Sequence, residues 1–283
     1  MTKFAIAGIQ MHITTQNNLA EMRKRVAILM HMYPWVEMVV FSELAAHGPV
    51  LHSAQPAGGE FEQEFCEIAK QYDIWLQPGS YFESRNGKIY NTAPVINPQG
   101  EVITRYSKMF PFTPYEDGVT PGEEFCVFDV PDVGRFGLSI CYDVWFPELT
   151  RTLASMGAEV LINPVNASFV DRPADIACAR ASAAMFQMYV FHINGLLAGG
   201  NGYSQVIDPS GRVLHDGCVQ EEMIPIEIDF SEVRRQRQRG IMNMGQPLKS
   251  FRDTKARFPI YEDGYSSEYL DGLGPLEKAA RVR

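Results

Sequence analysis

One cysteine directly follows a predicted strand, at a position where a side chain can be displayed for chemistry. In residues 135–140 apolar side chains alternate with small or polar ones, which predicts a strand with one buried face that stops at Cys141. Pro147 suits the first turn of a following helix, and Gly157 suits its end. A thiol at such a junction is a candidate nucleophile, but most free cysteines are small buried core residues. The local pattern alone leaves both roles open.

A cysteine nucleophile needs activation, because a free thiol is mostly protonated at neutral pH. Histidine is the usual activating base, yet no histidine here has sequence neighbours typical of a catalytic base or a metal ligand. We expect structural or surface roles for all six: His12, His31, His47, His52, His192 and His215. Glycine motifs of the serine-elbow, dinucleotide and phosphate-loop types are also absent.

Two charged residues stand among apolar neighbours at the ends of other predicted strands. Glu43 follows the apolar run 37–41, where partial desolvation would raise the pKa of its carboxyl toward a useful general-base value. Lys108 precedes the apolar run 109–112 and could stabilise an oxyanion. Taken singly, each also fits a plainer role, Glu43 as an exposed loop residue and Lys108 as a side chain that reaches out to solvent.

Composition excludes several other classes of protein. With 46% hydrophobic and 21% charged residues, the chain is typical of a globular protein. A formal net charge of -9 argues against nucleic acid or an anionic membrane as the main partner, so we expect the basic run 234–239 to be a solvated helix face. No apolar run is long enough to span a bilayer, and the N-terminus does not resemble a signal peptide.

The cysteines indicate a reducing compartment. Their number is odd and they are scattered, with no Cys-x-x-Cys pair; they are Cys66, Cys126, Cys141, Cys178 and Cys218. This pattern is neither a disulfide framework nor a zinc cage. We therefore expect a cytoplasmic protein without a bound metal.

The order of predicted elements repeats along the chain. A strand at 3–11, a helix at 19–30 and a strand at 37–41 form a unit that implies parallel pairing, and a third strand is predicted at 74–82. A similar order begins with the strand that ends at Cys141, and Asp171 is expected to cap its second helix. Two short segments also match each other, residues 95–102 and residues 206–213. We infer an α/β protein of two related halves, with two mixed sheets face to face and helices outside.

The periodic pattern ends after Arg239. Residues 240–257 are predicted to be loop-like, 258–261 to form a last apolar patch, and 262–283 to be a polar tail beyond a domain of residues 1–261. The tail contains a few larger apolar side chains, Tyr265, Tyr269 and Leu270. A tail that cannot form its own core either stays mobile or packs on a partner subunit.

Three segments taken together resemble the motifs of the nitrilase superfamily of carbon–nitrogen hydrolases. They are Phe-Ser-Glu-Leu at 41–44, Arg-Tyr-Ser-Lys at 105–108 and Ile-Cys-Tyr-Asp-Val-Trp-Phe-Pro-Glu at 140–148, in the family's order and at its usual separations. The resemblance covers roughly residues 3–261 and implies a four-layer α-β-β-α sandwich. It also implies a catalytic triad that needs no cofactor, with Glu43 as general base, Lys108 as oxyanion stabiliser and Cys141 as nucleophile.

The resemblance extends to further residues of the site. Residues 108–116 are similar to the aliphatic amidase branch, which makes Glu116 a second glutamate beside the lysine and the backbone N–H of Tyr142 part of the oxyanion hole. Cys-Tyr-Asp at 141–143 is closer to the amidase and carbamoylase branches than to true nitrilases, which usually have Cys-Trp-Glu. Expected substrate contacts lie at Tyr115, Tyr142, Trp145, Asn166 and Phe169.

The expected activity is hydrolysis of a small carboxamide to an acid and ammonia through a thioester. N-carbamoyl amidohydrolysis and acyl transfer from the same thioester are the alternatives. Carbamoylases often hold a carboxylate with an arginine three or four residues after the cysteine, where this chain has Val144 and Trp145; Arg172 is the candidate replacement. The resemblance also implies a homodimer or larger homo-oligomer, with the tail packed across subunits.

Overall fold

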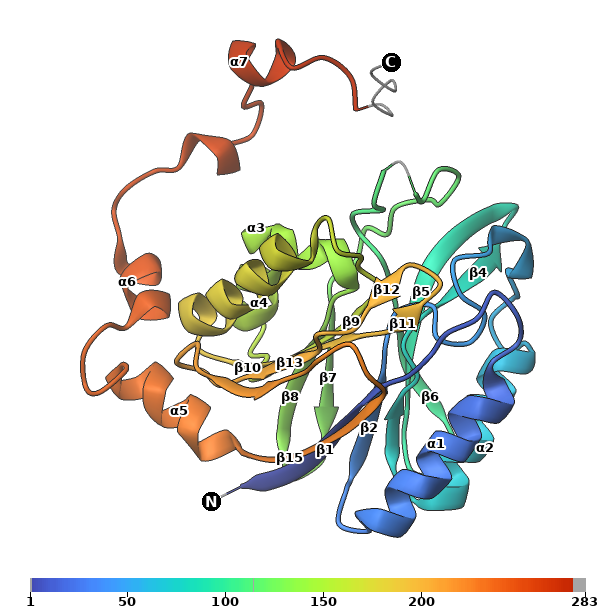
Figure 1. Ribbon diagram of the computed structural model, residues 1–283. Coiled ribbons are helices and arrows are strands. Elements are labelled where there is room, and N and C mark those ends of the chain that lie inside the picture. The colour runs from blue at the N-terminus through green and yellow to red at the C-terminus, as the bar shows by residue number, and fades with distance from the viewer. Residues whose placement is uncertain (1, 114, 277–283) are drawn as a thin grey trace.

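The longest apolar runs of the sequence form strands that are buried along almost their whole length. These include β1 (Lys3–Gln10), β2 (Met38–Phe41), β9 (Val160–Val165) and β10 (Tyr189–Asn194). A strand that reads as continuously apolar must be covered on both faces. The computed structural model describes residues 2–113 and 115–276, and in it two sheets cover each other on one side while helices cover their outer sides (Figure 1).

The first sheet has the strand order β15-β1-β2-β3-β5-β4, with β6 paired to β5. Its other strands are β3 (Trp75–Gln77), β4 (Tyr81–Arg85), β5 (Lys88–Ile96), β6 (Val102–Ser107) and β15 (Glu222–Asp229). Helices α1 (Leu19–Met32) and α2 (Glu60–Tyr72) pack on its outer face through a shared apolar cluster. The strand predicted at 74–82 is therefore two strands, because Pro78 and Gly79 interrupt it.

The second sheet has the strand order β14-β13-β10-β9-β8-β7. Its other strands are β7 (Cys126–Val130), β8 (Gly134–Leu138), β13 (Gln205–Ile207) and β14 (Val213–Asp216). Helices α3 (Pro147–Ser155) and α4 (Arg172–Phe186) cover its outer face, and a small hairpin of β11 (Leu196–Leu197) and β12 (Gly200–Asn201) lies apart. The expected four-layer α-β-β-α sandwich is confirmed (Figure 1).

The two halves repeat the same topology. In the first half β1-β2-β3 are parallel and β5 and β6 follow antiparallel; in the second half β8-β9-β10 are parallel and β13 and β14 follow antiparallel. The matching segments 95–102 and 206–213 connect the equivalent hairpins. Each hairpin has a register shift at the same point of the match, Val95/Ile96 and Val206/Ile207. The predicted relation between the halves is therefore present in the backbone.

The C-terminal segments depart from the simplest expectations. Helix α5 (Phe230–Arg239) contains the basic run, but its Arg234 pairs with Glu159 at 2.7 Å and its Arg237 donates to the carbonyls of Ala158, Phe186 and Gln187. Part of the run therefore fastens α5 to the second sheet, and only part is a solvated face. Within 240–257, predicted to be loop-like, Pro247–Asp253 forms helix α6.

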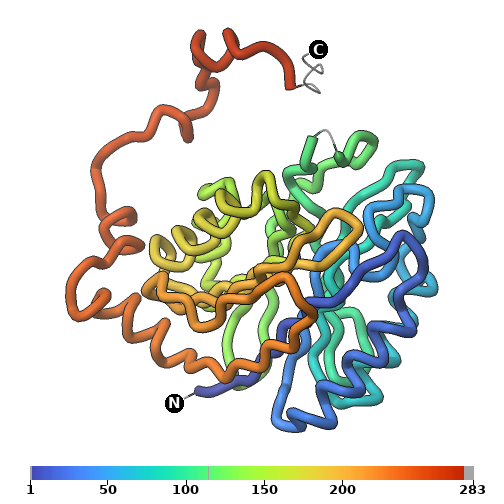
Figure 2. The backbone as a smooth tube through the Cα atoms, in the orientation of Figure 1, coloured from blue at the N-terminus to red at the C-terminus, as the bar shows by residue number. Residues whose placement is uncertain are grey.

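Beyond α6 the chain leaves the body of the molecule and continues as an extended strap (Figure 2). The strap carries two short helical turns, Pro259–Tyr261 (η3) and Glu268–Asp271 (α7). Its apolar side chains are exposed, with Tyr269 at 77% and Leu276 at 89%. Residues 277–283 of the predicted tail lie outside the described residues. Among the described helices none has the length and apolar character needed to cross a membrane.

A glycine beside the end of β2 has no room for a side chain. Gly79 has φ +81°, and a Cβ there would lie 1.8 Å from the carbonyl oxygen of Ser42. Gly87 has a similar φ of +75°, but a Cβ added there would have nothing within 4 Å. The two glycines therefore separate the effect of backbone conformation from the effect of a close contact.

We expect Gly79→Ala to lower the free energy of unfolding by about 2 kcal/mol more than Gly87→Ala does. Both changes place alanine at positive φ, at a cost of about 1 kcal/mol, but only Gly79→Ala also forces two backbone segments apart. Urea unfolding of both variants checks this. Equal destabilisation by the two changes would contradict it.

Candidate active site

The predicted catalytic residues converge at the carboxyl ends of strands from both sheets. Glu43 follows β2 of the first sheet, and its N–H donates to the carbonyl of Val165 at the end of β9 in the second sheet, at 3.2 Å. Lys108 follows β6, and Cys141 opens the short 3-10 helix η2 (Cys141–Trp145) after β8. The site therefore lies where the two sheets meet at one end of the sandwich.

Lys108 is the centre of a buried ion cluster. Its ammonium Nζ donates to Glu43 Oε1 at 2.8 Å and to Glu116 Oε2 at 2.6 Å, and the residue is only 1% exposed. The amide of Asn91 donates to both carboxylates, at 2.8 Å and 2.7 Å. The alternative in which Lys108 reaches out to solvent is therefore excluded. A buried cation needs such partners, because an unpaired one would cost several kcal/mol.

The carboxyls of the two glutamates have different pKa values although they share one cation. Burial raises the pKa of Glu43 to about 7, against the attraction of Lys108 and with help from the charge of Glu116. Burial also opposes ionisation of Glu116, but Lys108 and hydrogen bonds from Phe112 N–H and Asn91 hold its pKa below the usual range. The pKa of Lys108 stays well above its ordinary value, since the surrounding negative charges outweigh its burial.

The thiol of Cys141 is next to the base that it needs. Cys141, Glu43 and Asn166 line the same cavity. The thiol is among the neighbours that lower the pKa of Glu43, and the backbone N–H of Asn166 lowers the pKa of the thiol. Burial and the charge of Glu43 raise the pKa of the thiol well above its ordinary value, while Lys108 lowers it. The thiol is therefore protonated at neutral pH, and a base must take its proton as it attacks.

The turn that carries Cys141 is strained and held by an aspartate that the sequence reasoning did not select. Cys141 has φ 46°, in the left-handed region that side chains rarely adopt. Asp143 Oδ2 accepts from the N–H of Ile140 at 2.9 Å and from the hydroxyl of Tyr106 at 2.7 Å, and its Oδ1 accepts from the N–H of Phe110 at 2.9 Å. The aspartate thus ties the cysteine turn to the segments on either side of Lys108. Its only sequence signal was a charged residue within the cysteine motif.

A cavity of about 320 Å³ opens onto the thiol. Its lining includes the four predicted charged and nucleophilic residues and four of the five predicted contacts, which are Glu43, Lys108, Glu116, Cys141, Tyr115, Tyr142, Trp145 and Asn166. Phe169 is not in this lining and is 72% exposed. Its position on the outside of the loop after β9 explains this difference from the expectation.

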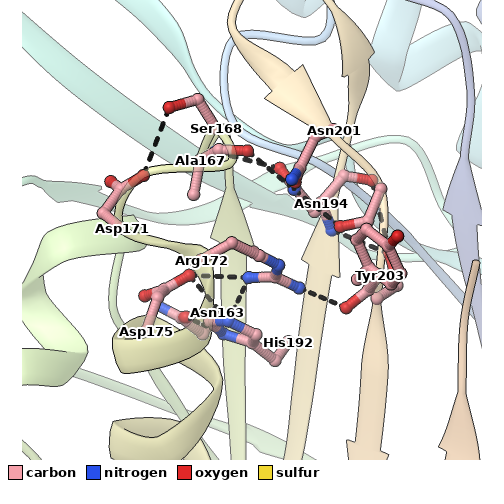
Figure 3. Close-up of polar contacts among 12 residues, drawn as sticks. Asn163, Ala167, Ser168, Asp171, Arg172, Asp175, His192, Asn194, Asn201 and Tyr203 are labelled. Atoms are coloured by element: carbon pink, nitrogen blue, oxygen red, sulfur yellow. Dashed lines mark hydrogen bonds and ion pairs between the residues drawn. The ribbon is translucent and has the colours of Figure 1, made fainter. Parts of the chain in front are cut away.

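Arg172 does not bind a substrate carboxylate, because its side chain lies behind the residues that line the cavity. Its guanidinium pairs with Asp175 at 2.6 Å, contacts His192 at 2.6 Å and donates to the carbonyl of Tyr203 (Figure 3). His192 in turn contacts Asp175 at 3.0 Å and Asn163 at 2.6 Å. This buried network holds Asp175, which does line the cavity and which the sequence reasoning missed. Among the described residues no cluster of side chains could hold a metal ion.

Comparison with known proteins agrees with the fold and identifies the family. The family model "Carbon-nitrogen hydrolase" matches residues 5–238. The chain belongs to this carbon–nitrogen hydrolase family.

Particular relatives are amidases of that family. The chain is 32% identical to omega-amidase NIT2 of Homo sapiens over 202 residues, which are 65% of this chain and 72% of the relative. It is 28% identical to omega-amidase NIT2 of Danio rerio over 262 residues, which are 83% and 93% of the two chains. The crystal structure of Saccharomyces cerevisiae Nit3, a nitrilase superfamily member, has a TM-score of 0.77 at 26% identity, and the match covers 84% of this chain and 94% of that one.

The pKa of the Glu43 carboxyl offers a direct test of this electrostatic arrangement. We expect this carboxyl to titrate near pH 7 in the folded protein, and we expect Glu116→Gln to shift its titration to lower pH, because a neighbouring negative charge is removed. Infrared difference spectra of the carboxyl band, with Glu43→Gln used for assignment, measure both values. Glu268→Gln, in the exposed strap, is the control and leaves the midpoint unchanged. A higher midpoint in Glu116→Gln would contradict the assignment.

Proposed function

We propose that this protein hydrolyses a small carboxamide to a carboxylic acid and ammonia through a thioester at Cys141. The observation that supports this most is that Glu43, which accepts from the Lys108 ammonium at 2.8 Å, lines the same cavity as the Cys141 thiol. A nucleophile, its base and a fixed positive charge are thus present within one cavity.

The first half of the reaction forms the thioester. Glu43 takes the thiol proton as the sulfur of Cys141 attacks the amide carbon. The negative charge that develops on the oxygen is stabilised by Lys108 Nζ and by the backbone N–H of Tyr142, which lies in the first turn of η2 where backbone donors have no intrahelical partner. Glu43, now protonated, gives its proton to the leaving nitrogen, and ammonia departs.

The second half regenerates the enzyme. Glu43, ionised again, takes a proton from water as the water oxygen attacks the thioester carbon, and the Cys141 sulfur leaves and regains a proton from Glu43. A glutamate can serve in both directions when its pKa lies near the working pH, and that of Glu43 is raised to about 7. Glu116 acts on the substrate only through Lys108, whose ammonium it holds in place.

Hydrolysis of N-carbamoyl amino acids is less well supported. That reaction calls for a cation to hold the substrate carboxylate, and Arg172, the candidate for this task, is occupied by Asp175. Acyl transfer uses the same thioester and differs only in the second nucleophile. Hydrolysis and acyl transfer are therefore distinguished by identifying the products, because the geometry of the site suits both reactions.

We expect ammonia release from a panel of simple aliphatic amides, and we expect Cys141→Ala to abolish it. Loss of the sulfur removes the covalent step, so kcat should fall by at least about 10⁴-fold. Met156→Leu changes a surface residue away from the cavity and is the control, with kcat expected to stay as in the unmodified protein. Full activity in Cys141→Ala would defeat the proposal. Hydroxamate formed faster than acid in the presence of hydroxylamine would instead indicate an acyltransferase.

We also propose a cytoplasmic homodimer or larger homo-oligomer. All five cysteines are free, which suits a reducing compartment. The strap after α6 presents exposed apolar side chains that its own subunit does not cover; they are Ile260, Tyr265, Tyr269, Leu270, Leu273 and Leu276. A second copy of the chain is the partner that would bury them.

We expect a chain truncated before Glu262 to be a monomer where the full chain is an oligomer. The reason is that truncation removes exposed apolar surface that only an intersubunit contact can bury. Sedimentation velocity of the two chains at equal concentration measures this. If the truncated chain still sediments as the same oligomer as the full chain, the strap does not mediate assembly.

A further inference from the structure

The catalytic cavity contains more negative charge and more hydrogen-bond acceptors than the catalytic steps use. Besides Glu43 and Glu116 it is lined by Asp171 and Asp175, and among the described lining residues Lys108 is the one basic side chain. The ammonium of Lys108 is already paired with both glutamates. Asp175 is paired with Arg172 behind the cavity wall, whereas Asp171 has no ion pair among the described residues. The two aspartates and Arg172 together therefore carry a net negative charge.

Asp175 is held in the cavity wall, and one of its carboxylate oxygens can accept further hydrogen bonds. The residue is 1% exposed, and its Oδ2 is paired with Arg172 and His192. Its Oδ1 receives only a long hydrogen bond of 3.3 Å from the indole nitrogen of Trp145. An ionised carboxylate accepts about four hydrogen bonds, so Oδ1 keeps room for a donor on a ligand. Although burial opposes ionisation, His192 and Arg172 hold the pKa of Asp175 below its usual range.

Asp171 and Asn166 add further unused acceptors on the same side. Asp171 precedes α4, but contrary to expectation its side chain does not cap that helix and accepts only from the hydroxyl of Ser168, at 3.3 Å. The side-chain nitrogen of Asn166 donates to the carbonyl of Ala198, while its Oδ1 is buried without any partner. A buried acceptor without a donor costs about 1–3 kcal/mol, which a ligand donor would recover.

Aromatic rings also line the cavity, and one of them, Trp145, contacts Asp175. Phe112 and Tyr115 stack with centroids 5.6 Å apart, and Tyr142 and Trp145 lie 5.4 Å apart. Aromatic faces next to carboxylates favour organic cations, since the ring face and the carboxylate both attract positive charge. A carboxylate in the same position would meet like charge without a free cation to pair with.

We propose that the preferred substrate is an amide whose acyl chain ends in a protonated amine, and that Asp171 and Asp175 select for it. This rests on the proposed amidase function and names the substrate class of the same cavity. The amide carbon lies at Cys141, the ammonium pairs with the aspartates, and its remaining N–H groups reach acceptors such as Asn166 Oδ1. Anionic acyl chains are rejected by charge, and neutral ones leave the acceptors unpaired.

The test compares three amides of matched chain length near pH 7.5, where the amine is charged. They are pentanamide, its isostere in which the terminal methyl group is replaced by an ammonium, and the monoamide of glutaric acid. We expect kcat/KM for the ammonium amide to exceed that for pentanamide by about tenfold and that for the anionic amide by about a hundredfold. Butylammonium should also inhibit competitively, and butyrate should not.

Variants then assign the preference to the cavity. Asp171→Asn should lower the ratio of kcat/KM for the ammonium amide over pentanamide by about fivefold. Asp132→Asn removes the same charge at the exposed turn between β7 and β8 and should leave the ratio as in the unmodified protein. Because Asp175→Asn leaves Arg172 buried without its partner, it is tested only after its unfolding curve shows a folded protein.

The outcomes separate this inference from the proposed function. If simple amides are hydrolysed but the ammonium amide is no better than pentanamide, the inference fails and the amidase function stands. If Asp171→Asn and Asp132→Asn change the ratio equally, the assignment to the cavity fails. If none of the amides is hydrolysed and butylammonium binds with no heat by calorimetry, both proposals fail.

Discussion

The burial of one ammonium group is the constraint on which the site depends. Lys108 lies in the interior, so its charge must be met by nearby carboxylates, and Glu43 and Glu116 meet it at 2.8 Å and 2.6 Å. Asn91 then joins the two carboxylates into one network. Satisfying this one cation fixes the positions of the base and of the cysteine turn that packs beside it. In the proposed function, the cluster that stabilises the buried charge also supplies the general base and the oxyanion stabiliser.

The arrangement also shows how one cation supports two carboxylates in different states. Glu116 accepts a hydrogen bond from the N–H of Phe112, and this bond favours its charged form. Both carboxylates accept from Lys108 and Asn91, and burial dominates the pKa of Glu43. The pKa of Glu116 therefore lies below the usual range and that of Glu43 above it, and in the proposed reaction Glu43 is the carboxyl that exchanges protons.

The sequence predicted those features that are encoded locally. Alternation and strand-end positions made Cys141, Glu43 and Lys108 candidates, and the resemblance to the nitrilase motifs gave them their expected roles. The repeated element order predicted the two related halves. Contacts between segments that are far apart in the sequence could not be predicted in the same way. Asp143 acts through Tyr106, and Arg172 through His192 and Tyr203, so their roles appear only when the strands are placed side by side.

The basic run of α5 likewise resembles any solvated helix face, and nothing near Arg237 in sequence indicates that its partners are carbonyls 50 and 79 residues away. The prediction that Arg172 binds a substrate carboxylate was wrong. Asp175, one helical turn further along α4, binds the guanidinium of Arg172 behind the residues that line the cavity.

The position of β1 has a consequence for synthesis of the chain. β1 is made before β15, one of its two neighbours in the sheet, and the register of this pair joins Lys3 to Asp229 and Gln10 to Glu222. Until the ribosome has made β15, an almost wholly apolar strand keeps one edge of backbone donors and acceptors open. Open apolar edges recruit other strands. The edge of β1 that β15 later covers is therefore a place where the nascent chain can pair with the wrong strand.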